Sequence, residues 1–316
     1  MKKKWISLAM AALMAITALT GCGSSSADTL NELTVTYVTA PLNVPSIVEK
    51  EKGIFGKAFA DQGISVNYAE LTSGADQTQA LASGDVQVLY AVGATSVILS
   101  AANGADIKVL NLYSRSPKAF CMYTKDASIT SPADLKGKTI AGPAGTNLHE
   151  LLAAYLATEN MTMADVNFVN MTLPEAKAGL DGGSLDVALL AGAGAYQAEQ
   201  QGYHLIADGE GLIDAVIAVA VTEEFYQTHP EVIETLMTAQ EEISTFLEEN
   251  EAEALELSAA ALDLDVSAVT EMYKCYDFST EITDADRAGF QRTADFLYDA
   301  GMIDQKLDVN TIFFDK

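Results

Sequence analysis

The sequence predicts an α/β fold built as two lobes of similar construction. Strand-like and helix-like segments alternate between residues 33 and 221, and such alternation is typical of largely parallel sheets covered by helices. Two stretches also repeat one local pattern: a helix, a turn with Gly and Asp, a strand, and another Gly. The turns are Gly84-Asp85 and Gly183–Asp186, and the closing glycines are Gly93 and Gly192. This repetition favours two lobes.

The elements of the first stretch follow from runs of Val, Ile, Leu and Tyr bounded by turn residues. The expected strands are 33–38, 64–71, 86–91 and 107–112. One expected helix follows the first strand and ends at Lys52, and two more cover 73–82 and 95–103. The same criteria apply to the second stretch. There the expected strands are 119–123, 138–141, 167–171 and 187–190, and the expected helices are 147–159 and 174–180.

A returning strand and a helical C-terminal third complete the predicted order. The strand is Val216–Val221. Beyond it, apolar residues keep helical spacing with Glu-rich positions between them, which predicts helices packed on a core. The apolar positions are Ile233, Leu236, Met237, Ile243, Phe246 and Leu247, then Val269, Met272, Tyr273 and Tyr276.

The N-terminus predicts export and anchoring. Lys2–Lys4 precede an apolar run, Trp5–Thr20, that is typical of a secretion signal rather than a stable membrane span. Leu19-Thr20-Gly21-Cys22 resembles the lipobox of bacterial lipoproteins, in which the Cys is acylated. We therefore expect a signal peptide over 1–21, a lipid anchor at Cys22, and a polar tether over 22–32 that holds the protein at the extracytoplasmic face of the membrane.

Charge and residue types exclude several classes of function. The formal charge of −26 opposes binding to nucleic acid or to anionic lipid. Cys121 and Cys275 lack C-x-x-C spacing, and His149, His204 and His229 are scattered, so we expect neither a metal nor a cofactor. Buried free thiols are the expectation for the two cysteines, with a disulfide between them as the alternative.

Four phrases of the sequence, in order, resemble one family. They are LTVTYVTAPLNVPSIVEKEKGIF (33–55), TSGADQTQALASGDVQV (72–88), VGATSVILSAANGADIKVL (92–110) and SPADLKGKTIAGPAGTNLHELL (131–152). The chain resembles the substrate-binding proteins of the ABC importers for aliphatic sulfonates, taurine, nitrate and thiamine precursors over roughly residues 33–250.

The resemblance implies a two-lobe, periplasmic-binding-protein type II architecture with a hinge and a ligand cleft between the lobes. Transferred here, lobe one would be 33–115 plus 220–316, lobe two would be 116–219, and the hinge strands would lie near 114–118 and 216–221. The implied function is capture of a small organic ligand by lobe closure, and delivery to an ABC permease and its ATPase. A monomer is expected.

The ligand is expected at loops that follow strands, because ligands of open α/β sheets lie beyond the carboxyl ends of strands. These loops are rich in small residues, which lets backbone approach a ligand. The candidate ligand-binding residues are Thr39, Ala40, Pro41, Leu42, Asn43, Ser73, Gly74, Asp76, Gly93, Ala94, Thr95, Gly145, Thr146, Asn147, His149, Ala191, Gly192 and Asp214. Asn147 with Glu150 also fits a capping box, and Ser73 also fits a simple turn residue.

The ligand class stays open between two chemistries. These loops contain no Arg or Lys, and the nearest cations are Arg115 and Lys118, so we do not expect a simple aliphatic amino acid. A sulfonate-like anion could rest on backbone amides at the start of the helix at Asn147. Alternatively Asp76 or Asp214 could hold the ring nitrogen of a thiamine-precursor-like heterocycle. The aromatic residues that could flank such a body are Tyr37, Tyr90, Tyr113 and Tyr196.

Two departures from the sulfonate-binding pattern weaken that assignment. Ala191-Gly192-Ala193-Gly194 stands where relatives commonly carry a Trp, and Pro143-Ala144 replaces a Lys-bearing turn.

Two other functions compete with transport. One is an enzyme on the same fold, which the absence of a Cys cluster and of a nucleophile–base pair disfavours. The other is a ligand-sensing lipoprotein that signals to a receptor.

Overall fold

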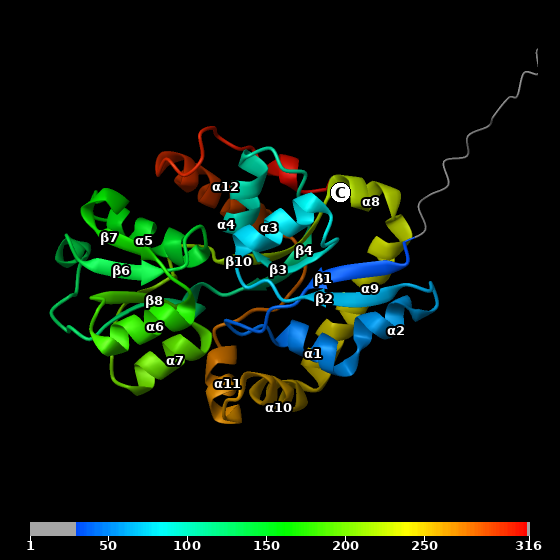
Figure 1. Ribbon diagram of the computed structural model, residues 1–316, viewed down its shortest axis with the longest axis horizontal. Coiled ribbons are helices and arrows are strands. Elements are labelled where there is room, and N and C mark those ends of the chain that lie inside the picture. Colours follow the sequence, from blue (N-terminus) through cyan, green and yellow to red (C-terminus); the bar gives the residue numbers. More distant parts are fainter. Residues whose placement is uncertain (1–29, 315–316) are drawn as a thin grey trace, which may run out of the picture.

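The computed structural model describes residues 30–314. The expected signal peptide, the acylated Cys22 and most of the tether therefore lie outside the described residues. Over the described residues the chain forms the predicted two-lobe α/β fold (Figure 1). None of the described helices combines the length and apolar character needed to cross a bilayer.

The first lobe contains two small sheets. β1 and β2 pair in parallel, and β3, β10 and β4 form a three-stranded sheet in that order. A bridge between Val35 and Val88 joins the two sheets. The strands are β1 (Glu32–Thr36), β2 (Ser65–Ala69), β3 (Leu89–Gly93), β4 (Lys108–Arg115) and β10 (Val216–Val221).

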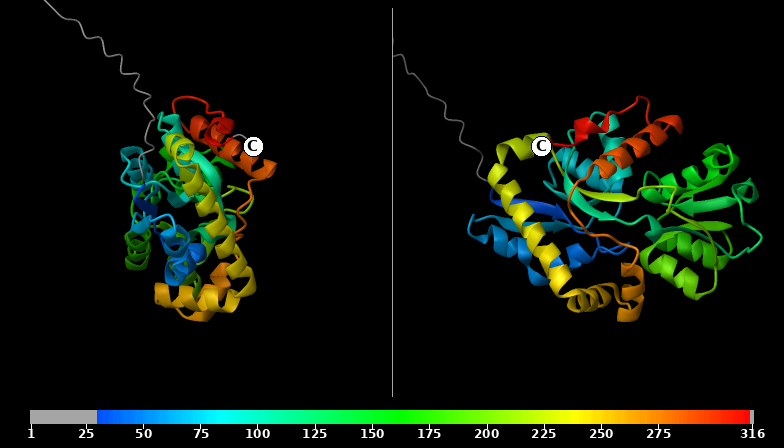
Figure 2. Two further views of the ribbon diagram at one scale, coloured as in Figure 1. Left: turned by 90° about the vertical axis from the view of Figure 1, so that its right-hand side faces the viewer. Right: turned by 180° about the vertical axis from the view of Figure 1, so that it is seen from behind.

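Helices from both ends of the chain cover these sheets. α9 crosses one face of the lobe as its longest described helix, and α12 lies beside α4 (Figures 1 and 2). The helices are α1 (Val44–Lys52), α2 (Ile54–Ala60), α3 (Gly74–Ser83), α4 (Ala94–Ala102), α8 (Glu223–Thr228), α9 (Pro230–Glu249), α10 (Glu251–Leu262), α11 (Val266–Tyr273) and α12 (Asp284–Asp299), with a 3-10 turn at Val309–Ile312.

The second lobe is a five-stranded sheet in the order β7-β6-β8-β5-β9, with helices on both faces. The strands are β5 (Phe120–Thr124), β6 (Thr139–Gly142), β7 (Asn167–Asn170), β8 (Val187–Ala191) and β9 (His204–Asp208). The helices are α5 (Asn147–Ala157), α6 (Leu173–Gly182) and α7 (Gly192–Gln200), with 3-10 turns at Pro117–Ala119, Pro132–Leu135 and Met163–Asp165.

Two strands and one irregular segment connect the lobes. β4 leads out of the first lobe and β10 leads back, and the two strands pair where Val216 meets Arg115. The segment between α11 and α12 passes behind them (Figure 2, right), where Arg115 and Asp277 exchange backbone hydrogen bonds of 2.8 and 2.9 Å. The exact lobe boundaries and the hinge remain predictions.

Strand direction corrects one expectation. The sheets are mixed rather than largely parallel, because β10 runs antiparallel to β3 and β4, and β5 runs antiparallel to β8 and β9. The physical reason is the path of the chain. A strand that returns from the other lobe enters the sheet from the opposite end, so it inserts between two parallel neighbours in the reverse direction.

Core packing follows the predicted periodicity. In α9 the residues Ile233, Leu236, Ile243 and Leu247 are buried, and Met237 and Phe246 pack against the same cluster while half-exposed. The predicted core role of this apolar stripe is thus confirmed. The predicted segments did not include β9, α2, α7, α8, α10 or α12. For three of these the signal is weak, because β9 is half-exposed and because α7 and α10, rich in Ala, Gly and Glu, show little contrast between apolar and polar positions.

Candidate functional site

The starts of two helices from different lobes meet across the molecule. α4 begins directly after Gly93 in the first lobe, and α5 begins after Gly145-Thr146 in the second. The Ser96 hydroxyl donates to the Gly145 carbonyl oxygen at 3.1 Å, and the Thr95 hydroxyl oxygen lies 2.8 Å from Asn147 Oδ1. Gly93 fits closely here, since an added Cβ would lie 3.5 Å from Asn147 Oδ1. Two of the predicted ligand loops are therefore in direct contact.

A buried carboxyl group lies at the centre of this contact. Glu150 of α5 is 5% exposed, with Oε2 lying 2.6 Å from the Thr95 hydroxyl and Oε1 lying 2.9 Å from the Thr293 hydroxyl of α12. Burial raises the pKa of this carboxyl, although the hydroxyl contacts lower it. We refer to Thr95, Asn147, Glu150 and Thr293 as the interlobe cluster.

A second contact between the lobes involves the loop after β1. Gly192, at the start of α7, has φ of +57°, and an added Cβ would lie 2.0 Å from the Pro41 carbonyl oxygen. The loop around Pro41 is held by Asn43, whose side-chain amide donates to the Val38 and Ala40 carbonyls at 2.9 and 3.2 Å. Only a residue without a side chain fits at position 192 in this arrangement.

The loop before α3 reaches the same region through Ser96. An added Cβ on Gly74 would lie 2.1 Å from the Ser96 Oγ atom. Ser73 caps α3 by accepting a hydrogen bond of 3.2 Å from the backbone N–H of Asp76, which is the simple turn role weighed above. The Asp76 side chain is exposed. All five predicted loops thus have residues at or near the contact between the lobes.

The predicted capping box at Asn147 is wrong. Thr146 occupies the N-cap position, and Asn147 and Glu150 turn their side chains toward Thr95 instead. The hydroxyl of Thr146 donates to the Pro143 carbonyl at 2.8 Å. His149 secures the turn through Nδ1, which accepts from the Gly145 N–H at 3.2 Å, while its ring stacks on Phe168 at a centroid distance of 4.6 Å.

Three of the four charged residues that the sequence offered as ligand partners form ion pairs within the described residues, whereas the fourth, Asp76, is exposed. Arg292 binds Asp214 at 2.6 Å, Arg115 binds Asp286 at 2.6 Å, and Lys118 binds Glu210 at 3.0 Å. Arg115 also donates to the Ser279 and Glu281 carbonyls. At this contact the polar groups left without a charged partner are therefore backbone amides and neutral side chains.

The tyrosines lie mainly inside the first lobe. Tyr90 and Tyr113 are 3% and 2% exposed and pack edge to face with a centroid distance of 5.1 Å. Tyr37 lies under the ammonium group of Lys50, which is 3.7 Å from its ring centre. Tyr196 of α7 packs against the core cluster of the first lobe and so contributes to the contact between lobes.

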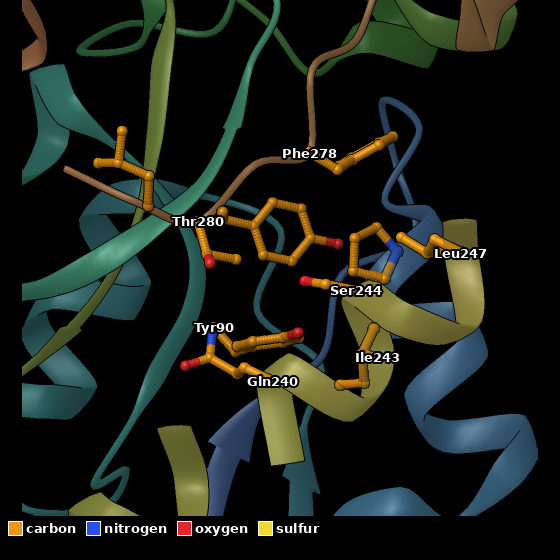
Figure 3. Close-up of a pocket in the computed structure, with 10 residues that line it drawn as sticks. Tyr90, Gln240, Ile243, Ser244, Leu247, Phe278 and Thr280 are labelled. Atoms are coloured by element: carbon orange, nitrogen blue, oxygen red, sulfur yellow. The ribbon is translucent and has the colours of Figure 1, made fainter. Parts of the chain in front are cut away.

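One hollow lies within the first lobe and another lies between α3, α4 and the Gly145 turn of the second lobe. The smaller, about 10 Å³, lies between Tyr90, Ser244, Phe278 and their neighbours (Figure 3), and it has room for about one water molecule. The larger is an open groove of about 310 Å³ along α3 and α4, bordered by Ser96 and Gly145. Its neutral lining opens beside the contact between the lobes.

One buried polar group in this region has no partner among the described residues. Asn147 is 3% exposed, and its Nδ2 atom is buried without a hydrogen-bond partner among the described residues. A buried donor that stays unpaired costs about 1–3 kcal/mol, so a bound acceptor would be favourable there. The first turns of α4 and α5 also carry backbone N–H groups that no residue of their own helix can accept.

Sequence reasoning missed Thr293 and the interlobe role of Glu150. Glu150 was visible only as a helix-capping partner, and Thr293 lies far away in sequence on α12. No local motif marks either residue, because their contact depends on how α12 packs against α5.

This fold and site define a two-lobe binding protein of the periplasmic-binding-protein architecture. The model of the family described as "NMT1/THI5 like" matches residues 41–254, which is more than half of the chain. The protein belongs to that family, as the resemblance of its four phrases predicted.

Known proteins and structures agree with this placement. A Bacillus subtilis (strain 168) protein named "Putative aliphatic sulfonates-binding protein" is 28% identical over 93% of this chain and 90% of its own length. The taurine-binding periplasmic protein of Escherichia coli (strain K12) is 29% identical over 64% of this chain and 62% of its own. The alkanesulfonate-binding protein SsuA from Xanthomonas axonopodis pv. citri, solved with bound MOPS, shares the fold at a TM-score of 0.81 and 21% identity, over 90% of this chain and 98% of that one.

Proposed function

We propose that this protein is an extracytoplasmic solute-binding protein of an ABC importer that holds a small organic anion between its lobes. The unpartnered Asn147 Nδ2 atom carries the proposal, because it is a buried donor at the contact between the lobes. The N-termini of α4 and α5 add orphan N–H groups and the positive ends of two helix dipoles. The lobes meet in this structure, so a ligand would enter after they separate and be enclosed when they close.

A sulfonate is the favoured anion. The names of two relatives assign aliphatic sulfonates and taurine to those proteins, and a third was solved with MOPS. Of the two carboxylates that could hold a heterocycle, Asp214 is already bound by Arg292, which leaves only the exposed Asp76 for that alternative. Recognition by donors without a fixed cation suits a weakly hydrated group such as a sulfonate.

Isothermal titration calorimetry with a panel of ligands tests this function. The panel contains ethanesulfonate, taurine, nitrate, a thiamine-precursor pyrimidine and the common amino acids. We expect binding of a sulfonate and a more compact scattering profile of the complex. Tight binding of an amino acid alone, or an unchanged profile at saturating sulfonate, would contradict the proposal.

Delivery to a membrane permease and its ATPase completes the proposed role, with the protein acting as a monomer and as a binder rather than an enzyme. The N-terminal sequence supports anchoring through Cys22. Cys22→Ala should release the protein from membranes or leave its signal unprocessed. Normal processing and full membrane retention of this variant would refute the anchor.

A further inference from the structure

With the Asn147 amide oxygen facing Thr95, as in this structure, the hydrogen bonds of the interlobe cluster require one more proton than its hydroxyls supply. The Thr95 hydroxyl oxygen lies 2.8 Å from Asn147 Oδ1 and 2.6 Å from Glu150 Oε2. A threonine hydroxyl carries a single proton, so it can donate to only one of these oxygens. A carboxylate and an amide oxygen are both pure acceptors, and two acceptors cannot share one hydroxyl proton at these distances.

The second proton has one place to reside. Asn147 Oδ1 cannot carry it, whereas a protonated carboxyl is a donor as well as an acceptor. The second oxygen of Glu150 accepts from Thr293 at 2.9 Å, so its proton belongs on Oε2. We infer that Glu150 is a neutral carboxylic acid in the closed protein, and that its proton orients the Asn147 amide so that the N–H group is free for an anionic ligand.

The surroundings of Glu150 favour the neutral form. The carboxyl is 5% exposed, and burial raises its pKa. The charged group that acts on it is Asp214, which raises the pKa further and is itself bound by Arg292 of α12. Within α5, burial lowers the pKa of the neighbouring His149, so that ring supplies less positive charge.

The other elements packed against Glu150 bring little compensating charge. α4 has no titratable side chain over Ala94–Ala102. Three further charged residues on α12 have other partners. Asp286 binds Arg115, Asp295 accepts from Gln291, and Arg287 lies over the Phe313 ring.

The proton determines which end of the Asn147 amide meets the ligand. In the neutral state the chain of donors runs from Glu150 Oε2 to Thr95 and from Thr95 to Asn147 Oδ1, which leaves Nδ2 unpartnered among the described residues. If Glu150 ionises, its carboxylate accepts the hydrogen bond of the Thr95 hydroxyl. The Asn147 amide must then turn to donate to Thr95, and it presents its carbonyl oxygen instead.

A proton on Glu150 therefore prepares the site for an anion. Loss of this proton turns the Asn147 N–H group away from the ligand and adds a negative charge to the site. This coupling between the Glu150 proton and anion binding rests on the proposed function. The protonation of Glu150 itself does not rest on it. Binding of an anion should take up one proton wherever free Glu150 is ionised. Since a raised pKa favours the protonated state, affinity should be highest at low pH and fall as the pH rises through that pKa.

The first experiment measures the Kd for ethanesulfonate by calorimetry between about pH 5 and about pH 8.5. For the natural protein, coupling to one proton weakens binding by up to about tenfold per pH unit once Glu150 ionises. Glu150→Gln is the matched variant, because its amide N–H donates to Thr95 and its carbonyl accepts from Thr293 at every pH. We expect the affinity of this variant for ethanesulfonate to vary with pH only as far as the other titratable groups make it vary. Equal pH dependence in both proteins would overturn the coupling.

The second experiment needs no ligand. The infrared C=O stretch of a protonated carboxyl is separate from that of carboxylates, and it should be present near neutral pH and diminished in Glu150→Gln. Glu49→Gln identifies the share of Glu49, a second buried carboxyl whose pKa is raised. If Glu150→Gln leaves the band unchanged, the protonation of Glu150 is refuted. If the band changes as expected and no sulfonate binds at any pH, the proton assignment stands and the proposed ligand class fails.

Discussion

Gly192 lies against the Pro41 carbonyl oxygen so closely that a Cβ atom would stand 2.0 Å from it. The two residues belong to different lobes, so this contact exists only when the lobes are together. Gly192→Ala should therefore hold the lobes apart. We expect loss of most ligand affinity and a less compact scattering profile.

The control for that variant is Gly202→Ala. Gly202 has φ of +74°, and an added Cβ would meet nothing within 4 Å among the described residues. Both variants carry the backbone strain of a left-handed alanine, about 1–2 kcal/mol, but only Gly192→Ala creates the clash. Equal affinity in the two variants would show that the contact does not control closure.

Thr293 supplies a hydrogen bond across the lobes to Glu150. Thr293→Val keeps the shape and removes the hydroxyl, which leaves a buried acceptor unpaired at a cost of about 1–3 kcal/mol. The cost falls on the closed state, so ligand affinity should drop roughly fivefold or more. The control is Thr270→Val in α11, where an exposed hydroxyl bonds only its own helix. An affinity loss as large in Thr270→Val would contradict a specific role for Thr293.

Arg115 stabilises the crossing between the lobes rather than the ligand. Burial would raise the pKa of Asp286, but hydrogen bonds from Arg115 and Thr283 hold it at about 2. Arg115→Ala leaves a carboxylate that is 6% exposed without its cation, so unfolding free energy should fall by about 3 kcal/mol. Arg292→Ala breaks an exposed pair and should cost less than about 1 kcal/mol. Chemical denaturation of both variants measures the difference, and similar losses would refute it.

The same pair predicts acid sensitivity. The pKa of Asp286 is lower in the folded chain than its ordinary value of 3.8, so its stabilisation is complete above that value. It should disappear as the pH falls through about 2. In Arg115→Ala this part of the acid transition should be absent, and an unchanged pH profile of unfolding would contradict the assignment.

The raised pKa of Glu49 predicts a folding stability that decreases, rather than increases, as the pH rises. Burial raises its pKa from 4.5 to about 7, against hydrogen bonds from Tyr68 and from the Phe55 N–H. The folded chain then holds a proton that the unfolded chain releases, so stability should decrease by up to about 1.4 kcal/mol per pH unit between about 4.5 and about 7. Glu49→Gln retains the acceptor and should abolish this slope. Parallel pH profiles of the melting temperature would show that Glu49 does not titrate there.

The order of strands and helices could be predicted because each element has its own local signal. Alternating apolar residues and turn glycines defined most strands and helices within a few residues. The loops of the candidate site could be predicted to lie near one another for a related reason: each follows a strand, and strand ends at one edge of a sheet come together. The polar pairing of Asn147 and Glu150 was misjudged, since a capping box and an interlobe cluster place the same residue types at the same spacing.

The sequence by itself thus determined the fold class and the family, and it predicted the loops of the candidate site. Only the tertiary structure decided that β10 runs antiparallel, that Arg115 and Asp214 are neutralised by residues of α12, and that Thr95, Thr293 and Glu150 meet. The reason is the separation of the partners along the chain. Thr95 and Glu150 are 55 residues apart and Glu150 and Thr293 are 143 apart, so packing of helices from distant segments, rather than any local pattern, brings them into contact.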